Sequence, residues 1–292
     1  MSFLGAILQD DCEIQQKIIE IRELSNDEEN ILDHAFKELA NLECLINTKY
    51  SLEQNFSEFI VYTDFLNKNQ SLVVQNNINI SEKMQEIIQE TNRLVLNVLF
   101  SLTATVEHFR HILKKTDVAE YEQMLNNLFD TCVEYAFIYK LRNFSQHQCL
   151  PISNIHIVES IEEIPKINVF LNKELLLNYD SWGKVVKPYL KKQDDVFEIT
   201  HALMNAVTNL NKNIFVYWIN RYIKKTYKDF EKVTNFIKEI MIYCEKQNCK
   251  AAYPMILEYI LPTQEHEKGV KLQFRHFPLR FLQKMGAINA AE

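Results

Sequence analysis

Apolar side chains recur at intervals of three and four residues along most of this chain, which is the spacing of one face of an α-helix. The pattern predicts a helix over residues 26–48, where Ser25 and Glu28 have the spacing of a capping box. The same rhythm predicts a second helix over residues 52–68. Residues 67–80, which are rich in Asn and Gln, carry little periodicity and are predicted to form a loop.

The longest regular apolar stripe follows Ser81, which is suited to cap its helix. Its apolar positions are Ile88, Val95, Leu99, Leu102, Val106, Phe109 and Leu113. After a turn at Thr116 and Asp117, a returning helix carries the stripe Tyr121, Leu125, Leu128, Cys132, Tyr135 and Tyr139. Because a short turn between two long helices indicates an antiparallel pair, we expect the core of a helical bundle here.

The pattern changes after Pro151. Residues 152–171 resemble two short strands joined by a turn, because isoleucine and valine dominate them without helical spacing. Helical spacing returns over residues 182–190, 196–217 and 229–247. The tail from Lys250 is interrupted by prolines and fits both helix and strand.

Composition agrees with a mainly helical fold. With 4 glycines and 6 prolines in 292 residues, the chain has few sites for the tight turns of an all-β or dinucleotide-binding fold. The sequence therefore predicts a mainly α protein, an antiparallel helical bundle with additional helices and a small β-hairpin. Its three expected parts are N-terminal helices packing on the bundle in 1–80, the helical pair in 81–151, and a mostly helical region with the hairpin in 152–292.

The net charge and the cysteines restrict the partners and the cellular compartment that we expect. A net charge of −7 argues against a protein that grips long duplex nucleic acid with its whole surface, although a local basic cleft is compatible with it. We see no secretory signal and no apolar stretch long enough to span a membrane. The 6 scattered cysteines therefore predict free thiols in a cytoplasmic protein that does not bind a membrane.

A cluster of polar side chains closes the returning helix, in the segment KLRNFSQHQCLP that ends at Pro151. The apolar stripe leads to Arg142, and the proline stops the helix from continuing. His147 can act as a base or an acid near neutral pH, and the guanidinium of Arg142 matches phosphate oxygens. Asn143 lies four residues before His147, so its amide can orient the imidazole or donate to a phosphate.

This set of residues is small for cleaving RNA. On an ideal helix, Arg142 and His147 lie about 140° apart around the axis. Arg142 must reach around the helix, or the last turn must loosen, before both can touch one phosphate. One histidine must also serve where an acid and a base are both needed.

The spacing of Arg142, Asn143 and His147 resembles the R-N-x-x-x-H signature of HEPN superfamily domains, and the resemblance covers about residues 82–151. It implies an antiparallel helical bundle with metal-independent endoribonuclease activity and no cofactor. It also implies a homodimer in which two copies of the motif face one cleft. A toxin or antiviral-defence role follows from the same resemblance, with RNA as substrate and an antitoxin or regulatory protein as a further partner.

A different class of function remains open. The acidic charge favours a non-catalytic helical module that binds RNA or a protein partner, and a regulatory subunit that sequesters another protein is a third reading. Lys271, Arg275 and Arg280 alternate with phenylalanines, a mixture suited to stacking on unpaired bases. The alternative for this basic stretch is a solvated face over the edge of a core.

Two further pairs of residues have the chemistry of metal ligands. His108 and His111 lie three residues apart on a predicted helix, and Cys244 and Cys249 are near each other in sequence. Neither pair has a second set of ligands at a matching spacing, so we expect no metal site.

Overall fold

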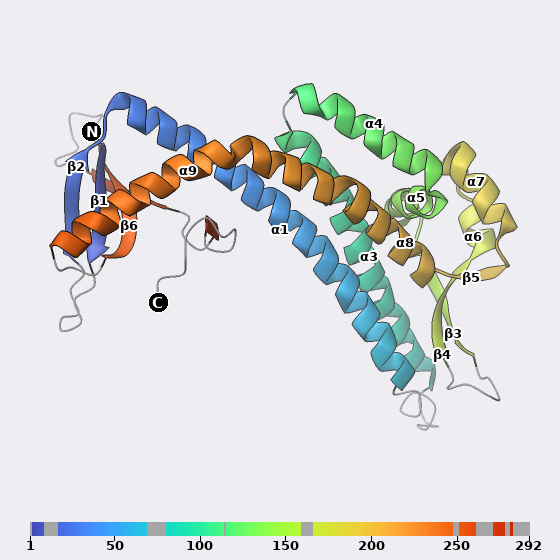
Figure 1. Ribbon diagram of the computed structural model, residues 1–292. Helices are drawn as coiled ribbons and strands as arrows, with labels where there is room; N and C mark the ends of the chain where they lie inside the picture. The colour runs from blue at the N-terminus through green and yellow to red at the C-terminus, as the bar shows by residue number, and fades with distance from the viewer. Residues whose placement is uncertain are drawn as a thin grey trace, which may run out of the picture. The chain divides into compact units, whose positions relative to one another are not determined.

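The computed structural model is mostly helical, as the sequence predicts (Figure 1). It describes residues 2–8, 17–68, 80–113, 115–158, 166–247, 251–260, 271–277 and 281–282. The chain divides into two compact units, of which the first contains Met1–Glu43 with Arg221–Glu292 and the second Cys44–Asn220. The chain passes between the units within α1 (Asn26–Lys68) and again within α9 (Val216–Lys246).

These units do not coincide with the predicted division into 1–80, 81–151 and 152–292. Both termini belong to the first unit, because the two ends of the chain pair in one β-sheet. The prediction of two helices over 26–48 and 52–68 is wrong in one respect, since α1 runs through both without a break.

The first unit contains a four-stranded antiparallel sheet with the order β2-β1-β6-β7. Its strands are β1 (Ser2–Leu8), β2 (Lys17–Glu23), β6 (Ala251–Ile260) and β7 (Lys271–His276). The two N-terminal strands were not predicted, because the sequence predicts only the helices of residues 1–80. The register pairs Leu4 with Ile256, and both side chains are buried. Within the described part of the tail that fitted both helix and strand, Ala251–Ile260 and Lys271–His276 form strands, and the N-terminal hairpin supplies the other two strands of the sheet.

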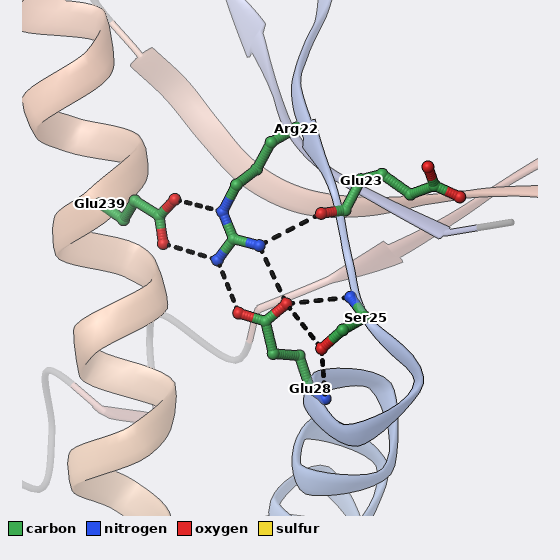
Figure 2. Close-up of polar contacts among 5 residues, drawn as sticks. All are labelled: Arg22, Glu23, Ser25, Glu28 and Glu239. Carbon is green, nitrogen blue, oxygen red and sulfur yellow. Dashed lines mark hydrogen bonds and ion pairs between the residues drawn. The ribbon is translucent and has the colours of Figure 1, made fainter.

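A charged cluster joins β2, the start of α1 and α9 within this unit (Figure 2). Arg22 donates from Nε to Glu239 at 2.5 Å and from Nη2 to Glu28 at 2.8 Å. The predicted capping box is confirmed, because the Ser25 N–H donates to Glu28 at 2.9 Å and the Glu28 N–H donates to Ser25 Oγ at 3.3 Å. Glu28 therefore caps α1 and binds Arg22 with the same carboxylate.

The second unit is built around α5 (Val133–His147). This helix packs against α3 (Ile80–Ile112), α4 (Lys115–Thr131), α7 (Gly183–Lys192) and α8 (Thr200–Leu210), as Figure 1 shows with α5 viewed almost end-on. One face of α5 is apolar and enters an aromatic core. The Phe137 and Phe144 rings each lie 5.8 Å from the Trp182 ring, and all three side chains are buried.

The predicted returning helix is broken at Cys132, which is a correction to the predicted bundle. Cys132 has an extended backbone (φ −116°, ψ 94°) between α4 and α5. Its N–H still donates to Leu128 O and its carbonyl accepts from Ala136 N, so it ends one helix and begins the next. Figure 1 shows that the axes of α4 and α5 diverge there. It is α5 that packs against α3, so α3 does not pair with one long returning helix as predicted. The helix antiparallel to α3 in this unit is α1, in which Cys44 lies near His108 and the Thr48 carbonyl accepts from Thr105 Oγ1.

The turn before α4 is also displaced from its predicted position. α3 ends at Ile112 and α4 begins at Lys115, so Thr116 and Asp117 lie in the first turn of α4. Near this turn the Tyr121 hydroxyl donates to Val106 O at 3.0 Å, which fixes the start of α4 against α3. Ser81, the predicted cap, lies inside α3, which already includes Ile80.

The predicted β-hairpin after Pro151 is confirmed. β3 (Ile152–Val158) pairs antiparallel with β4 (Lys166–Asn172), and its predicted turn lies largely outside the described residues. A third strand, β5 (Val196–Glu198), pairs with β4, so the helix predicted from Val196 begins only at Thr200. The predicted helix over 182–190 is confirmed by α7. The remaining short elements are α6 (Lys173–Leu177), η1 (Asp180–Trp182) and the π-turn η2 (Asn211–Phe215), which joins α8 to α9.

Candidate functional site

The Arg142, Asn143 and His147 cluster lies on the last two turns of α5, and the helix stays regular to its end. The Gln148 N–H donates to Phe144 O at 2.9 Å, which is close to the ordinary helical pairing, and His147 is the last helical residue. A helix continued to Pro151 would bring the proline ring against the carbonyl of His147. The predicted proline stop is therefore consistent with where α5 ends.

Because the last turn does not loosen, Arg142 and His147 keep the separation of about 140° that an ideal helix gives them. Asn143 lies between them, about 40° around the axis from His147. His147 is exposed, whereas Arg142 and Asn143 are each partly buried. The pair was expected to need either a loosened last turn or an Arg142 side chain that reaches around the helix. Since the turn is regular, the two groups of one chain can meet at one phosphate only if Arg142 reaches around.

Arg142 is directed toward α3. Its Cζ lies 5.8 Å from the centre of the Phe100 ring, a cation–π distance, and its Nη1 donates to Asn143 Oδ1 at 3.3 Å. Its Nε is buried and donates to no atom of the described residues. Arg142 also forms no ion pair with any carboxylate in the described part of the chain. Its positive charge is thus held in place by a ring and an amide, but it is not neutralised by an acid.

Asn92 of α3 holds the segment that follows the motif. The Ile152 N–H donates to Asn92 Oδ1 at 3.0 Å, and Asn92 Nδ2 donates to Ile152 O at 2.8 Å. Both residues are buried, so these bonds are shielded from water. β3 is an edge strand, and Asn92 takes the place of a neighbouring strand at Ile152. The segment 148–151 is therefore tied at both ends, by α5 on one side and by α3 on the other.

Arg275, in the C-terminal basic stretch, contacts acids of the protein and is not free to contact RNA as predicted. Arg275, on β7 in the first unit, forms an ion pair with Asp33 and a second one with Glu258 at 3.0 Å. Its guanidinium also lies 5.3 Å from the centre of the Phe36 ring. Phe277, one of the expected stacking residues, is buried. For Arg275, the structure therefore agrees with the alternative prediction, a face over the edge of a core, better than with a contact to nucleic acid.

The side chains of the other two predicted RNA contacts, Lys271 and Arg280, lie outside the described residues. Lys271 begins β7, but its side chain lies outside the described residues, and Arg280 lies outside them altogether. Cys249, a candidate metal ligand in the sequence, is also outside. Arg142, Asn143 and His147 belong to the second unit, whereas Arg275 belongs to the first.

The histidines of α3 are exposed. His108 Nδ1 lies 3.9 Å from the Cys44 thiol, and no described residue adds a third ligand beside them. Among all residues that the structure describes, no group of three or more His, Cys, Asp or Glu side chains is arranged to hold a metal ion. Within the same ranges, no helix combines the length and the apolar character needed to cross a bilayer.

Sequence reasoning missed Asn92 and Phe100, the two α3 residues that hold the motif. Asn92 had a visible signal, because it is a polar residue beside the buried positions of the longest apolar stripe. Phe100 had none, since its contact with Arg142 depends on the break at Cys132 that brings α5 against α3.

Comparisons with known proteins identify no relative of this chain: no family model, no curated protein and no solved structure matches it. The functional interpretation therefore depends on the residues themselves and on the short motif at the end of α5.

Proposed function

We propose that this chain is a metal-independent endoribonuclease whose active site is the end of α5. The observation that supports the proposal most directly is the state of Arg142. Its charge has no carboxylate partner within the described residues, and its Nε–H is buried and unused. A buried donor without an acceptor is unfavourable by about 1–3 kcal/mol, so a bound phosphate oxygen would relieve that cost. Asn143 and the exposed His147 lie within the next turn and a half.

The proposed reaction is the internal transfer that leaves a cyclic phosphate. His147 removes the proton of the ribose 2′-hydroxyl, and the 2′-oxygen attacks the adjacent phosphorus. The bond from phosphorus to the 5′-oxygen breaks, and that oxygen leaves with a proton from an acid. Arg142 stabilises the negative charge that accumulates on the phosphoryl oxygens, and Asn143 holds the guanidinium in position.

The separation of Arg142 and His147 favours a site shared by two copies of the chain. A single copy supplies one imidazole on one side of α5 and one guanidinium on another, whereas the reaction needs a base, an acid and a cation together. In a homodimer, the second copy supplies the missing acid and can place its Arg142 opposite the first copy's His147. The exposed end of α5 leaves His147 accessible to such a partner. This arrangement is also what the HEPN resemblance implies.

The biological setting belongs to the same proposal. A toxin or antiviral-defence effector, held inactive by an antitoxin or regulatory protein, is the role that the HEPN resemblance implies. The four described cysteines, Cys44, Cys132, Cys149 and Cys244, are free thiols, which suits a reducing cytoplasm.

A second function is favoured by a specific feature of the site. The C-terminus of a helix carries partial negative charge, which works against phosphate binding unless side chains compensate for it. The divergence of Arg142 and His147 favours a module that binds RNA or a protein at the end of α5 and cleaves nothing, and the helix dipole favours a protein partner over RNA.

The two functions differ in what happens to RNA. The purified protein is incubated with mixed single-stranded RNA in EDTA, and the products are analysed for 2′,3′-cyclic phosphate ends. We expect cleavage by the parent, and a rate lower by about 10²–10⁴-fold in His147→Ala, because a positioned general base or acid contributes about that factor. His111→Ala is the matched control, since it removes another exposed histidine from the last turn of a helix in the same unit.

Three results separate the outcomes. Cleavage by His147→Ala at the parental rate would refute the catalytic role. RNA that is retarded on a gel but stays intact supports the binding module. A shared active site predicts that mixing inactive His147→Ala with inactive Arg142→Ala restores partial cleavage, because half of the dimers are mixed and one of their two sites again holds one His147 and one Arg142 from different copies. The recovered activity stays below a quarter of the parental activity, because that site lacks the second imidazole that would act as the acid.

A further inference from the structure

A cavity of about 240 Å³ lies between α3, α4 and α5 in the second unit. At about 30 Å³ for each water molecule, this volume corresponds to about eight waters. Tyr135, Tyr139 and Lys140 line it from α5, about half a turn to two turns before Arg142, and Arg110 lines it from α3. The cavity is therefore separate from His147, and a ligand bound in it would not depend on the proposed nuclease activity.

Tyr135 is a buried side chain with an unused polar group. It is 2% exposed and lines the cavity, yet its hydroxyl forms no hydrogen bond with the described residues. Tyr121, the other fully buried tyrosine nearby, donates to Val106 O at 3.0 Å. Burial raises the pKa of Tyr135, so its hydroxyl remains a neutral donor at physiological pH. The hydroxyl itself is not among the buried polar atoms that lack a partner, so it is accessible from the cavity, where a ligand can bind it.

One of the charged side chains that line the cavity forms no ion pair with the described residues. Arg110 binds both oxygens of Glu122 and one oxygen of Glu107, and these bonds use three of its five N–H groups. Lys140 is partly buried and pairs with no carboxylate of the described residues. Arg110 is thus paired with two carboxylates, whereas the ammonium of Lys140 has no counter-ion among the residues described.

Three aromatic rings contribute to the lining, beside Val106, Leu125 and Asn126. The Tyr139 ring lies 6.3 Å from the Phe129 ring in an edge-to-face arrangement and 6.1 Å from the Tyr135 ring. Such rings favour a flat apolar ligand body that can stack or meet them edge-on. Aromatic walls with a few polar groups are also the usual lining of small-molecule sites.

We propose that this cavity binds a small aromatic monoanion, a single planar ring that carries one carboxylate. The carboxylate accepts hydrogen bonds from the Lys140 ammonium and the Tyr135 hydroxyl, and the ring lies against Phe129 and Tyr139. The volume admits one ring with its carboxylate. Within the described lining, no second unpaired cation is present for a dianion.

The test uses the full chain and three compounds of one shape, namely benzoate, benzamide and benzamidine. They carry one negative charge, no charge and one positive charge on the same ring. Binding is measured by isothermal titration calorimetry and by ligand-observed NMR. We expect benzoate to bind more tightly than benzamide by about tenfold or more, because hydrogen bonds to a charged group are stronger than neutral ones. Benzamidine is expected to show no saturable binding.

Variants assign the binding to the cavity. Lys140→Met should weaken benzoate binding by about tenfold or more and leave benzamide binding unchanged. Unchanged benzamide binding also shows that the variant is folded. Lys187→Met is the matched control, because it removes an exposed lysine of α7 in the same unit and should change neither affinity. Tyr135→Phe should weaken both compounds, because each accepts from its hydroxyl.

Several results would overturn the proposal. One is benzamide or benzamidine binding as tightly as benzoate. Another is benzoate binding that Lys140→Met leaves unchanged. The absence of saturable binding for all three compounds at millimolar concentration would overturn it as well. Cleavage of RNA is measured separately in Lys140→Met, and parental cleavage with lost benzoate binding would show that the two proposals stand independently.

Discussion

Replacing Asn92 with alanine tests how the end of α5 is held. Asn92 is buried and makes three hydrogen bonds, two to Ile152 and one from Nδ2 to Ile88 O at 3.0 Å. Ile88 O lies within α3 and keeps its helical partner when the side chain is removed. The N–H and the carbonyl of Ile152 face away from the sheet and lose their only described partners. The substitution thus leaves two buried backbone groups unsatisfied at one position.

The size of the effect follows from those two groups. Each buried donor or acceptor left without a partner costs about 1–3 kcal/mol, so Asn92→Ala should destabilise the local structure by about 2–6 kcal/mol. At about 1.4 kcal/mol for each factor of ten, the opening equilibrium at Ile152 should rise by about 30-fold or more. The motif helix should then lose one of its two attachments, since Ile152 lies five residues after His147.

Amide hydrogen exchange is the appropriate assay, because a chain with two compact units need not unfold in one step. Exchange of the Ile152 amide is compared in the parent, in Asn92→Ala and in Thr91→Val. Thr91 is the matched control, since it is the adjacent buried polar residue and its hydroxyl donates only within α3, to Ile87 O at 2.7 Å. Equal protection of Ile152 in the parent and in Asn92→Ala, or an equal loss in Thr91→Val, would refute the reasoning.

Two predictions concern the first unit. The pKa of Glu28 is lowered to about 2, first by the Arg22 hydrogen bonds, so its stabilising contribution is complete above the ordinary value of 4.5 and is lost as the pH falls from there to about 2. Thermal unfolding measured across that pH range should therefore decline less steeply in Glu28→Gln than in the parent, and parallel curves would contradict this. Gly5→Ala should destabilise the sheet by about 1–3 kcal/mol, because a Cβ there would lie 2.6 Å from Ile19 O and 2.7 Å from Leu257 Cδ1. Exchange of the β1 amides measures this effect, and parental protection would exclude the clash.

The sequence was sufficient where the deciding interactions are local. Ser25 and Glu28 lie three residues apart, and both bonds of the capping box form as their types and spacing require. The hairpin over 152–171 follows from a change of periodicity beside a proline. In both places the chemistry lies within a few residues, so a single sequence contains all of it.

The sequence did not predict the elements whose structure depends on residues far away in the chain. β1 is seven residues long and gains its second neighbour from β6, about 250 residues further along the chain. Nothing near Leu4 indicates that pairing. The break at Cys132 is hidden for another reason, because the apolar spacing of four and three continues through it from Leu128 to Tyr135. Periodicity reports which residues face a core, and it does not report where a helix axis turns.

Arg142 and Arg275 illustrate the same limit at the candidate site. The sequence predicts both as contacts for RNA, and both lie near an aromatic ring, Phe100 for one and Phe36 for the other. Arg275 is neutralised by Asp33 and Glu258, whereas Arg142 binds only the amide of Asn143 among the described polar groups. The acids that decide between them are far away in the sequence. The charge available to a phosphate therefore becomes visible only when the chain is folded.

The angle between Arg142 and His147 leads to a conclusion about assembly. Five residues on an unbroken α-helix always separate two side chains by about 140°, whatever surrounds them. α5 is regular through His147, so no local adjustment of this chain turns the imidazole toward the Phe100 side, where the guanidinium lies. While Arg142 stays against Phe100, a phosphate beside His147 must receive its cation from another molecule. A catalytic chain should therefore lose activity on dilution below its dimerisation constant, whereas a binding module should keep its affinity for RNA at any dilution.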